Sequence, residues 1–215
     1  MTFLHWAFEP HQVRGLLPEE FEVDMWDGAA WVSLTPFLMT GFRLGSLPPV
    51  PGLSTFPETN LRTYVRGPDG RDGLWFFSLE ADSVATVVGA STAYGVPYQW
   101  ADMSVDDEGT SVRYRSRRRS GRPVGHDITV EVGPPAGDVS ELDHWLTGRW
   151  RAYTRVGDRP AVVPVQHQPW SLCEASATAL EETLLDAAGL PQPTEAPRVQ
   201  FSPGVDVRLG LLRPL

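Results

Sequence analysis

Apolar and polar residues alternate along most of the chain, which is the pattern of half-buried β-strands. Two stretches, 21–37 and 58–81, each contain two such runs joined by a turn with glycine, and Asp27-Gly28 is a typical hairpin turn pair. We therefore expect two hairpins there. Further strands are predicted over 98–104, 111–118, 127–132, 149–155 and 161–168, with two short strands around Pro203-Gly204.

Four other segments have apolar residues at helical spacing. They are a short segment that ends near Gly15 to Pro18, the segment 82–95, a short segment that begins at Ser140, and the segment 176–190. The last has the clearest pattern, because Leu180 and Leu184 share one helical face and Gly189 follows as a C-terminal cap. The segment 45–57 carries too many prolines for a central strand, so we expect a surface loop or a lid there.

These elements predict an α+β protein that is mostly β. Several strands, such as 73–79, are apolar on both faces, which is typical of a closed or double-layered sheet with packing on each side. We expect a long antiparallel series of strands with two or three helices inserted. No segment has the composition of a linker, so residues 1–215 are expected to form a single domain.

The formal net charge of −9 disfavours binding to nucleic acid and to anionic membranes, because both attract basic surfaces. The one basic cluster, Arg113 to Arg122, alternates as on the solvent face of a hairpin strand. We interpret it as a solvated strand, with an anion or partner contact as the alternative. No apolar run is long enough to span a membrane and no signal-peptide pattern occurs, so a soluble cytoplasmic protein is expected.

Missing residue types exclude several chemistries. All 18 residues counted as lysine or arginine are arginine, so no lysine side chain can form a Schiff base with a carbonyl compound. The single cysteine, Cys173, excludes an internal disulfide and a multi-cysteine metal site. The five histidines form no HExxH motif or His-x-His pair, and no nucleotide-binding loop or serine-nucleophile motif is found. We therefore expect neither a metal nor a cofactor.

One predicted strand carries most of the candidate chemistry. Residues at even spacing on a strand share a face. Five polar-capable residues do so here: Glu58, Asn60, Arg62, Tyr64 and Arg66. This face is either solvated or, if it lines the inside of a barrel, a site where a carboxylate and a guanidinium bind an acid and move a proton.

Aromatic residues offer a second kind of candidate. Eight tryptophans are more typical of a core than of a ligand site. Even so, Trp75 and Phe77, followed in the chain by Tyr98 and Trp100, could line an apolar cavity.

Five motifs resemble, in order and over nearly the whole chain, the YqjF-type family of uncharacterised proteins. They are LLPEEFEVDMWDGAAWVSLTPFLM, FPETNLRTYVRGPDGRDGLWFFSLEAD, YGVPYQWADM, HQPWSL and FSPGVDV. More distantly, that family is similar to the acetoacetate decarboxylases. This resemblance implies a closed, cone-like antiparallel β-barrel with flanking helices and a pocket inside.

The same resemblance implies roles for two segments. In acetoacetate decarboxylases a Tyr-x-Glu motif supplies an acid, and Phe-Pro-Glu at 56–58 is similar to it, which puts Glu58 in the acidic position. A Gly-Phe-Pro-Lys-Lys motif supplies their Schiff-base lysine. Gly-Val-Pro-Tyr-Gln at 95–99 is similar, so Tyr98 and Gln99 occupy the lysine positions. Because neither side chain is an amine, decarboxylation by that route is excluded.

The sequence leaves two classes of function open. The first is an enzyme, such as a lyase, hydratase or isomerase, that acts on a small carbonyl or carboxylate compound without a lysine. Glu58 would be its acid or base, Arg62 would clamp a carboxylate, and Tyr98 would donate a hydrogen bond or act as a weak acid. The second is a non-catalytic barrel that binds a small ligand or has a structural role.

The expected partner is a small molecule, and the sequence does not decide whether the chain forms a homo-oligomer. Residues expected to contact the ligand are Asn60, Trp75, Phe77, Gln99, Trp100 and Met103.

Overall fold

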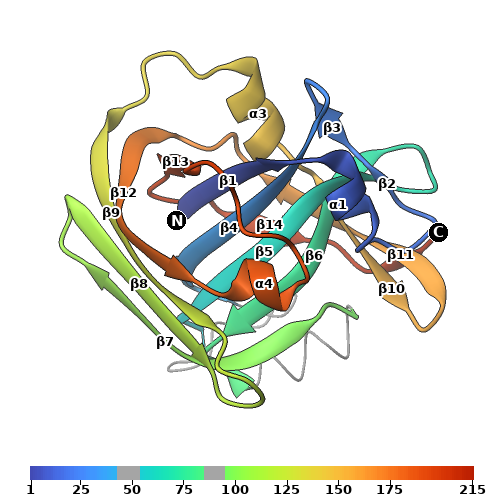
Figure 1. Cartoon of the computed structure of the whole chain (residues 1–215), viewed down its shortest axis with the longest axis horizontal. Coiled ribbons are helices and arrows are strands. Elements are labelled where there is room, and N and C mark those ends of the chain that lie inside the picture. Colours follow the sequence, from blue (N-terminus) through green and yellow to red (C-terminus); the bar gives the residue numbers. More distant parts are fainter. Residues whose placement is uncertain (43–53, 85–94) are drawn as a thin grey trace.

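The computed structural model describes residues 1–42, 54–84 and 95–215 and shows a mostly β protein, as expected (Figure 1). Within these ranges it has fifteen strands and three helices. The strands are β1 (Thr2–Phe8), β2 (Glu22–Val23), β3 (Met25–Trp26), β4 (Ala29–Met39), β5 (Phe56–Arg66), β6 (Asp72–Ala81), β7 (Tyr98–Asp107), β8 (Ser111–Arg118), β9 (Gly125–Pro135), β10 (Arg151–Val156), β11 (Arg159–His167), β12 (Cys173–Glu182), β13 (Arg198–Phe201), β14 (Val207–Leu209) and β15 (Arg213–Pro214). The helices are α1 (Pro10–Arg14), α3 (Glu141–Thr147) and α4 (Leu184–Ala187).

Nine of the described strands form a closed barrel, which confirms the expected architecture. Hydrogen bonding runs in the order β5-β6-β7-β8-β9-β12-β13-β1-β4 and returns from β4 to β5. One neighbouring pair differs from the expected antiparallel pattern, because β6 and β7 are parallel. A parallel pair needs a crossover connection, and here the chain between Ala81 and Tyr98 provides it.

Contacts across the barrel identify its inner face. Thr59 Oγ1 on β5 lies 2.9 Å from His126 Nε2 on β9, and Thr2 Oγ1 on β1 donates a hydrogen bond to the Tyr114 hydroxyl on β8. The two strands of each pair are not neighbours in the ring, so these side chains must point into the barrel. Because side chains alternate along a strand, Leu61 also points inward, and it is fully buried in the core.

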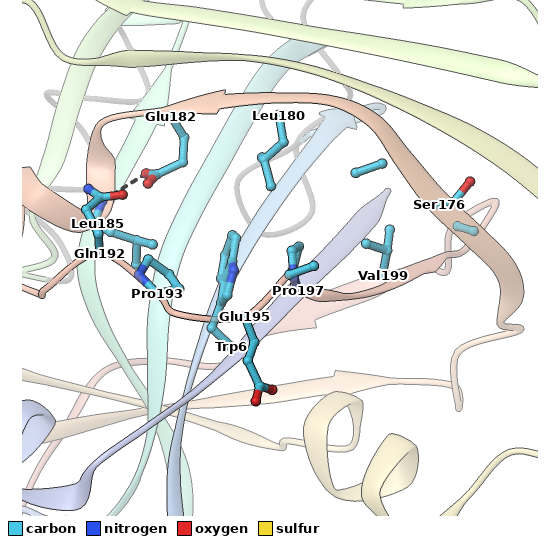
Figure 2. A pocket seen from close by; sticks show the side chains of 13 residues that line it. Trp6, Ser176, Leu180, Glu182, Leu185, Gln192, Pro193, Glu195, Pro197 and Val199 are labelled. Carbon is cyan, nitrogen blue, oxygen red and sulfur yellow. Dashed lines mark hydrogen bonds between the residues drawn. The ribbon is translucent and has the colours of Figure 1, made fainter.

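The barrel wall is open between β12 and β13. These strands pair only where the start of β12 meets the end of β13. Cys173 pairs there with Phe201, and Glu174 with Gln200. A pocket of about 570 Å³ lies where they separate, with residues 192–197 along one side (Figure 2).

The segment 176–190, predicted to be a helix, is mainly the second half of β12, so this prediction is wrong. Only Leu184–Ala187 is helical, as α4. A β-bulge explains the misleading pattern: Ala177 pairs with Val130 and Ala179 with Thr129, which leaves Thr178 as an extra residue. Because of this extra residue, the apolar residues Ala177 and Leu180 on one face of the strand are three positions apart in the sequence, as they would be on a helix. Pairing with β9 overrides the local preference of this segment for a helix.

The two short helices are confirmed. Helix α1 is followed by Gly15, and Ser140 caps α3 by accepting a hydrogen bond from the Asp143 amide. The predicted helix 82–95 and the predicted loop 45–57 lie largely outside the described residues. None of the helices in the described ranges is long and apolar enough to cross a membrane.

Buried His126 is expected to make the barrel sensitive to acid. Burial lowers the pKa of His126 from 6.5 to about 4. Between these pH values the unfolded chain binds a proton that the folded chain does not, so the free energy of unfolding falls as the pH drops through this window. His126→Gln should remove up to roughly 2 kcal/mol of the loss between pH 7 and pH 5, as measured by urea denaturation.

The matched control is His11→Gln, which changes an exposed histidine and should leave the pH dependence as in the wild type. Equal losses in His126→Gln and wild type would contradict the prediction.

Candidate functional site

The polar residues of β5 are buried, but on the outer side of the barrel wall. Glu58, Asn60 and Arg62 are at most 8% exposed. They alternate with Thr59 and Leu61, which point into the barrel, so they point away from it. This corrects the expectation of a site inside the barrel: Glu58, Asn60 and Arg62 point away from the lumen, which holds the main core cluster together with Thr59 and His126. We call the buried outer side of β1, β4 and β5 the polar face.

Glu58 and Tyr98 meet at one end of the polar face. The Tyr98 hydroxyl donates toward the Glu58 carboxyl, at 3.4 Å from Oε1 and 3.3 Å from Oε2. The two strands lie on opposite edges of β6, where Glu58 pairs with Ala81 and Tyr98 with Leu79. The fold thus brings together two residues that are 40 positions apart in the chain.

The environment of Glu58 favours its neutral form. Burial raises the pKa of Glu58 from 4.5 to about 8, against a smaller lowering by the Tyr98 hydrogen bond, while the nearby Glu80 carboxylate raises it further. A carboxyl group with this pKa is mostly protonated at neutral pH yet can release its proton. Such a group can act as an acid or, once ionised, as a base.

Arg62 lies further along the polar face, level with Ser33 on β4. Its guanidinium carbon is 5.7 Å from the centre of the Phe3 ring. Arg62 Nε and Asn60 Oδ1 are both buried without a hydrogen-bond partner among the described residues. Buried polar atoms are normally hydrogen-bonded, so these two atoms offer contacts to a bound molecule.

These groups suit an anion better than a metal. A guanidinium and an amide next to each other on a strand face can hold a carboxylate. Within residues 1–42, 54–84 and 95–215, no three His, Cys, Asp or Glu side chains are placed to hold a metal ion.

A hydrogen-bonded cluster lies on the same face. His5 Nδ1 is 2.6 Å from Ser33 Oγ, which is 2.7 Å from the Tyr64 hydroxyl. The Tyr64 hydroxyl donates to the Leu146 carbonyl, and burial lowers the pKa of His5 to about 3, helped by the charge of Arg62. Sequence reasoning identified Tyr64 on this face but neither His5 nor Ser33, because only the strand register places them beside it.

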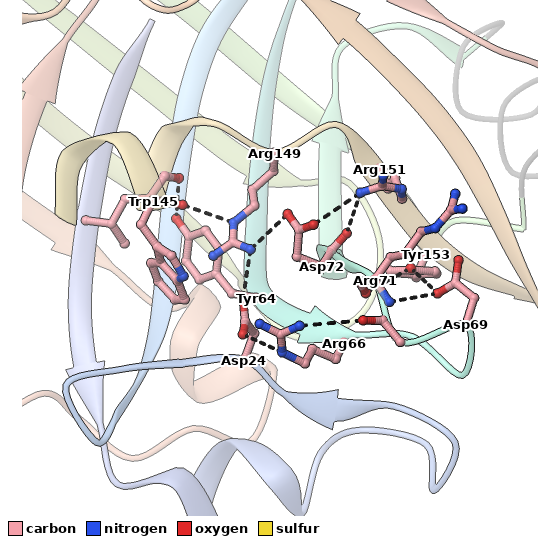
Figure 3. Close-up of polar contacts among 12 residues, drawn as sticks. Asp24, Tyr64, Arg66, Asp69, Arg71, Asp72, Trp145, Arg149, Arg151 and Tyr153 are labelled. Atoms are coloured by element: carbon pink, nitrogen blue, oxygen red, sulfur yellow. Dashed lines mark hydrogen bonds and ion pairs between the residues drawn. The ribbon is translucent and has the colours of Figure 1, made fainter. Parts of the chain in front are cut away.

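Helix α3 and Arg149, two residues after its end, cover this cluster. The ring centres of Trp145 and Tyr64 are 4.6 Å apart. The guanidinium carbon of Arg149 lies 4.2 Å from the Trp145 ring centre and 5.0 Å from the Tyr64 ring centre. Arg149 Nη1 also forms ion pairs with Asp24 at 2.8 Å and Asp72 at 3.2 Å (Figure 3). A buried charge network therefore holds α3 against β5.

The two predicted aromatic ligand contacts on β6 lie on the other side of the wall. Trp75 and Phe77 pack against the inner core cluster. Phe77 is the extra residue of a bulge, because Leu61 pairs with Ser78 and Arg62 with Phe76. The structure therefore does not bring Trp75 or Phe77 to Glu58.

The predicted contacts on β7 are divided between its two faces. Gln99 and Met103 lie an odd number of residues after Tyr98 on the strand, so their side chains point to the opposite face of β7. Trp100 shares the face of Tyr98 but is 42% exposed, with the Arg119 guanidinium 4.4 Å from its ring centre. Of the β7 candidates, the structure places Tyr98 beside Glu58 and leaves Trp100 at the protein surface.

The arginine cluster 113–122 lies on β8 and the following turn, as the hairpin interpretation predicts. Most of its members form ion pairs: Arg113–Asp127, Arg115–Asp106, Arg118–Glu80, Arg119–Asp102 and Arg122–Asp186. Arg118 differs from the rest because it holds Glu80, which is fully buried.

Sequence comparison identifies the family. The DUF2071 family, described as an uncharacterized conserved protein, matches residues 1–206. The chain belongs to this family. It is also 36% identical to the uncharacterized protein YqjF of Bacillus subtilis (strain 168) over 215 residues, which covers 99% of this chain and 88% of that protein.

Solved structures of acetoacetate decarboxylase-like proteins share the fold of this DUF2071 chain. Acetoacetate decarboxylase from Legionella pneumophila has a TM-score of 0.67 at 14% identity, covering 100% of this chain and 84% of its own. The enduracididine biosynthesis enzyme MppR, solved in complex with pyruvate, has a TM-score of 0.65 at 18% identity, covering 99% of this chain and 86% of its own. An acetoacetate decarboxylase-like enzyme from Sphingomonas wittichii RW1 has a TM-score of 0.64 at 14% identity, with coverages of 100% and 89%. These likenesses confirm the expected fold.

Proposed function

We propose that this DUF2071 protein binds a small keto acid or related carbonyl compound on the polar face, and that Glu58 and Tyr98 transfer a proton to or from it. The observation that carries the proposal is the Glu58–Tyr98 pair, in which a buried carboxyl of raised pKa lies within reach of a phenol. Groups with perturbed pKa values of this kind are typical of proton-transfer sites.

The two groups have complementary tasks. In its ionised form Glu58 removes a proton from the carbon next to the substrate carbonyl, while the Tyr98 hydroxyl donates to the developing enolate oxygen. Return of the proton to a different atom gives an isomerisation, and loss of a leaving group from the neighbouring carbon gives an elimination. Both outcomes need only acid–base chemistry, which suits a chain without lysine.

Arg62 supplies the carboxylate contact in this proposal. Its guanidinium is buried on the same face as Glu58, and its Nε has no partner among the described residues. Asn60 lies between Glu58 and Arg62 on the face and adds a second polar contact. The pyruvate bound to the MppR structure is a compound of the proposed class, on a protein of the same fold.

Exchange of the methyl protons of pyruvate in D₂O tests proton transfer without knowledge of the natural substrate. We expect the wild type to catalyse loss of the pyruvate methyl signal in proton NMR at pD near 8. Glu58→Gln should slow the catalysed exchange by about 10²–10⁴-fold, because the amide can neither release nor take a proton. Glu131→Gln, which changes an exposed glutamate on β9, is the matched control and should exchange at the wild-type rate.

Binding is measured separately by ligand-observed NMR with pyruvate and other small keto acids. Arg62→Ala should weaken binding of the acids more than Glu58→Gln does. Binding that requires Arg62 but brings no exchange in the wild type would indicate a non-catalytic binding protein. Neither binding nor exchange with any of these acids would overturn the proposal.

A further inference from the structure

We propose that the pocket between β12 and β13 is a second binding site, for a small apolar compound that carries a protonated amine. It lies on the inner side of the barrel wall, whereas Glu58 lies on the outer side. Trp6, which lines it, neighbours His5 in the chain but points to the opposite face of β1. The proposal does not depend on the proposed function.

The pocket exists because β12 and β13 separate after two residue pairs and because small side chains of β12 leave the gap unfilled. Beyond the two residue pairs that join β12 to β13, no backbone hydrogen bonds connect these strands in the described part of the chain. Ala175 and Ala177 of β12 line the gap, and Figure 2 shows Trp6, Leu180 and Val199 pointing into it. Its volume, about 570 Å³, is in the range of small-molecule sites.

One carboxylate, that of Glu182, lies among the side chains that line the pocket. Glu182 Oε2 accepts hydrogen bonds from the backbone amides of Leu184 and Leu185, at 2.7 and 3.0 Å. Its other oxygen, Oε1, has no hydrogen bond or ion pair to the described residues. Burial raises the pKa of Glu182, and the nearby Asp186 carboxylate raises it further. A cation bound at Oε1 would therefore stabilise the ionised carboxylate.

The charges around the pocket select the class of ligand. Glu195 lines the rim, and none of the 13 residues that line the pocket is basic. An anion would be repelled by Glu182 and Glu195, and a neutral apolar compound would leave both negative charges uncompensated. A ligand with an alkyl chain and an ammonium group matches both features. The chain would pack against Trp6 and Leu180, and the ammonium would pair with the Glu182 carboxylate.

The test compares octylamine with octanol and octanoate, which share the chain and differ in the head group. Isothermal titration of the wild type should show octylamine binding more tightly than either of the others. Glu182→Gln should weaken octylamine binding by about 10-fold or more, because the amide retains an acceptor for α4 but loses the charge. Ala177→Leu should weaken octylamine binding, because the larger side chain takes up part of the pocket.

The matched control is Ala179→Leu, the same substitution at an exposed position of β12, which should bind octylamine as the wild type does. Shifts of the Leu180 and Val199 methyl signals in the wild type locate the ligand even if Ala177→Leu does not fold. Equal affinity for octanol or octanoate, undiminished binding in Glu182→Gln, no binding to the wild type, or methyl shifts elsewhere would overturn the proposal.

Discussion

Glu58→Gln is expected to stabilise the protein at alkaline pH while it removes proton transfer. The pKa of Glu58 is raised to about 8 in the folded chain and returns to about 4.5 on unfolding. Between these pH values the folded chain holds a proton that the unfolded chain has released. The free energy of unfolding of the wild type therefore falls as the pH rises, by about 1.4 kcal/mol per pH unit for this group.

The glutamine side chain of this variant cannot ionise, so the variant should lose this slope. Relative to the wild type it should gain stability from pH 5 to pH 8, by roughly 3–4 kcal/mol in total. Urea denaturation at pH 5, 6.5 and 8 measures the difference, with Glu131→Gln as the exposed control. Parallel pH profiles for wild type and Glu58→Gln would show that Glu58 does not titrate in this way. A residue that costs stability in the ionised form is typical of a site kept for function.

Arg149→Met is expected to lower the free energy of unfolding by about 3–5 kcal/mol. The guanidinium is buried between Trp145 and Tyr64 and pairs with Asp24, whose side chain is 6% exposed. Methionine fills a similar volume but leaves the Asp24 carboxylate, among the described residues, with only its pair to Arg66 at 3.1 Å. For a chain of this size the loss corresponds to a melting temperature roughly 6–20 °C lower.

The control is Arg113→Met, which breaks the exposed ion pair with Asp127 and should cost far less stability than Arg149→Met, because solvent screens this pair. The double variant Arg149→Met with Asp24→Asn should recover part of the loss, because it removes the carboxylate that the single variant leaves buried. If Arg149→Met costs no more than Arg113→Met, the network does not hold α3 in place.

Local patterns predicted most of the strands and the two short capped helices. Alternation placed Glu58, Asn60 and Arg62 on one face of a strand, and the structure has them on one face. The absence of lysine is by itself enough to exclude lysine-based Schiff-base chemistry. The helix predicted over 176–190 failed for a local reason, since the bulge at Thr178 gives a strand the apolar spacing of a helix.

What the sequence alone determined is therefore which side chains share a strand face and which reactions the residue types permit, because both follow from backbone periodicity and side-chain chemistry. Tertiary structure alone decided which face looks into the barrel, because that depends on how nine strands close around a core. It also decided that Tyr98 reaches Glu58 while Trp75 and Phe77 do not, and that His5 and Ser33 join Tyr64. These contacts depend on strand register and on a single bulge in β6, where one extra residue changes which side chains face each other.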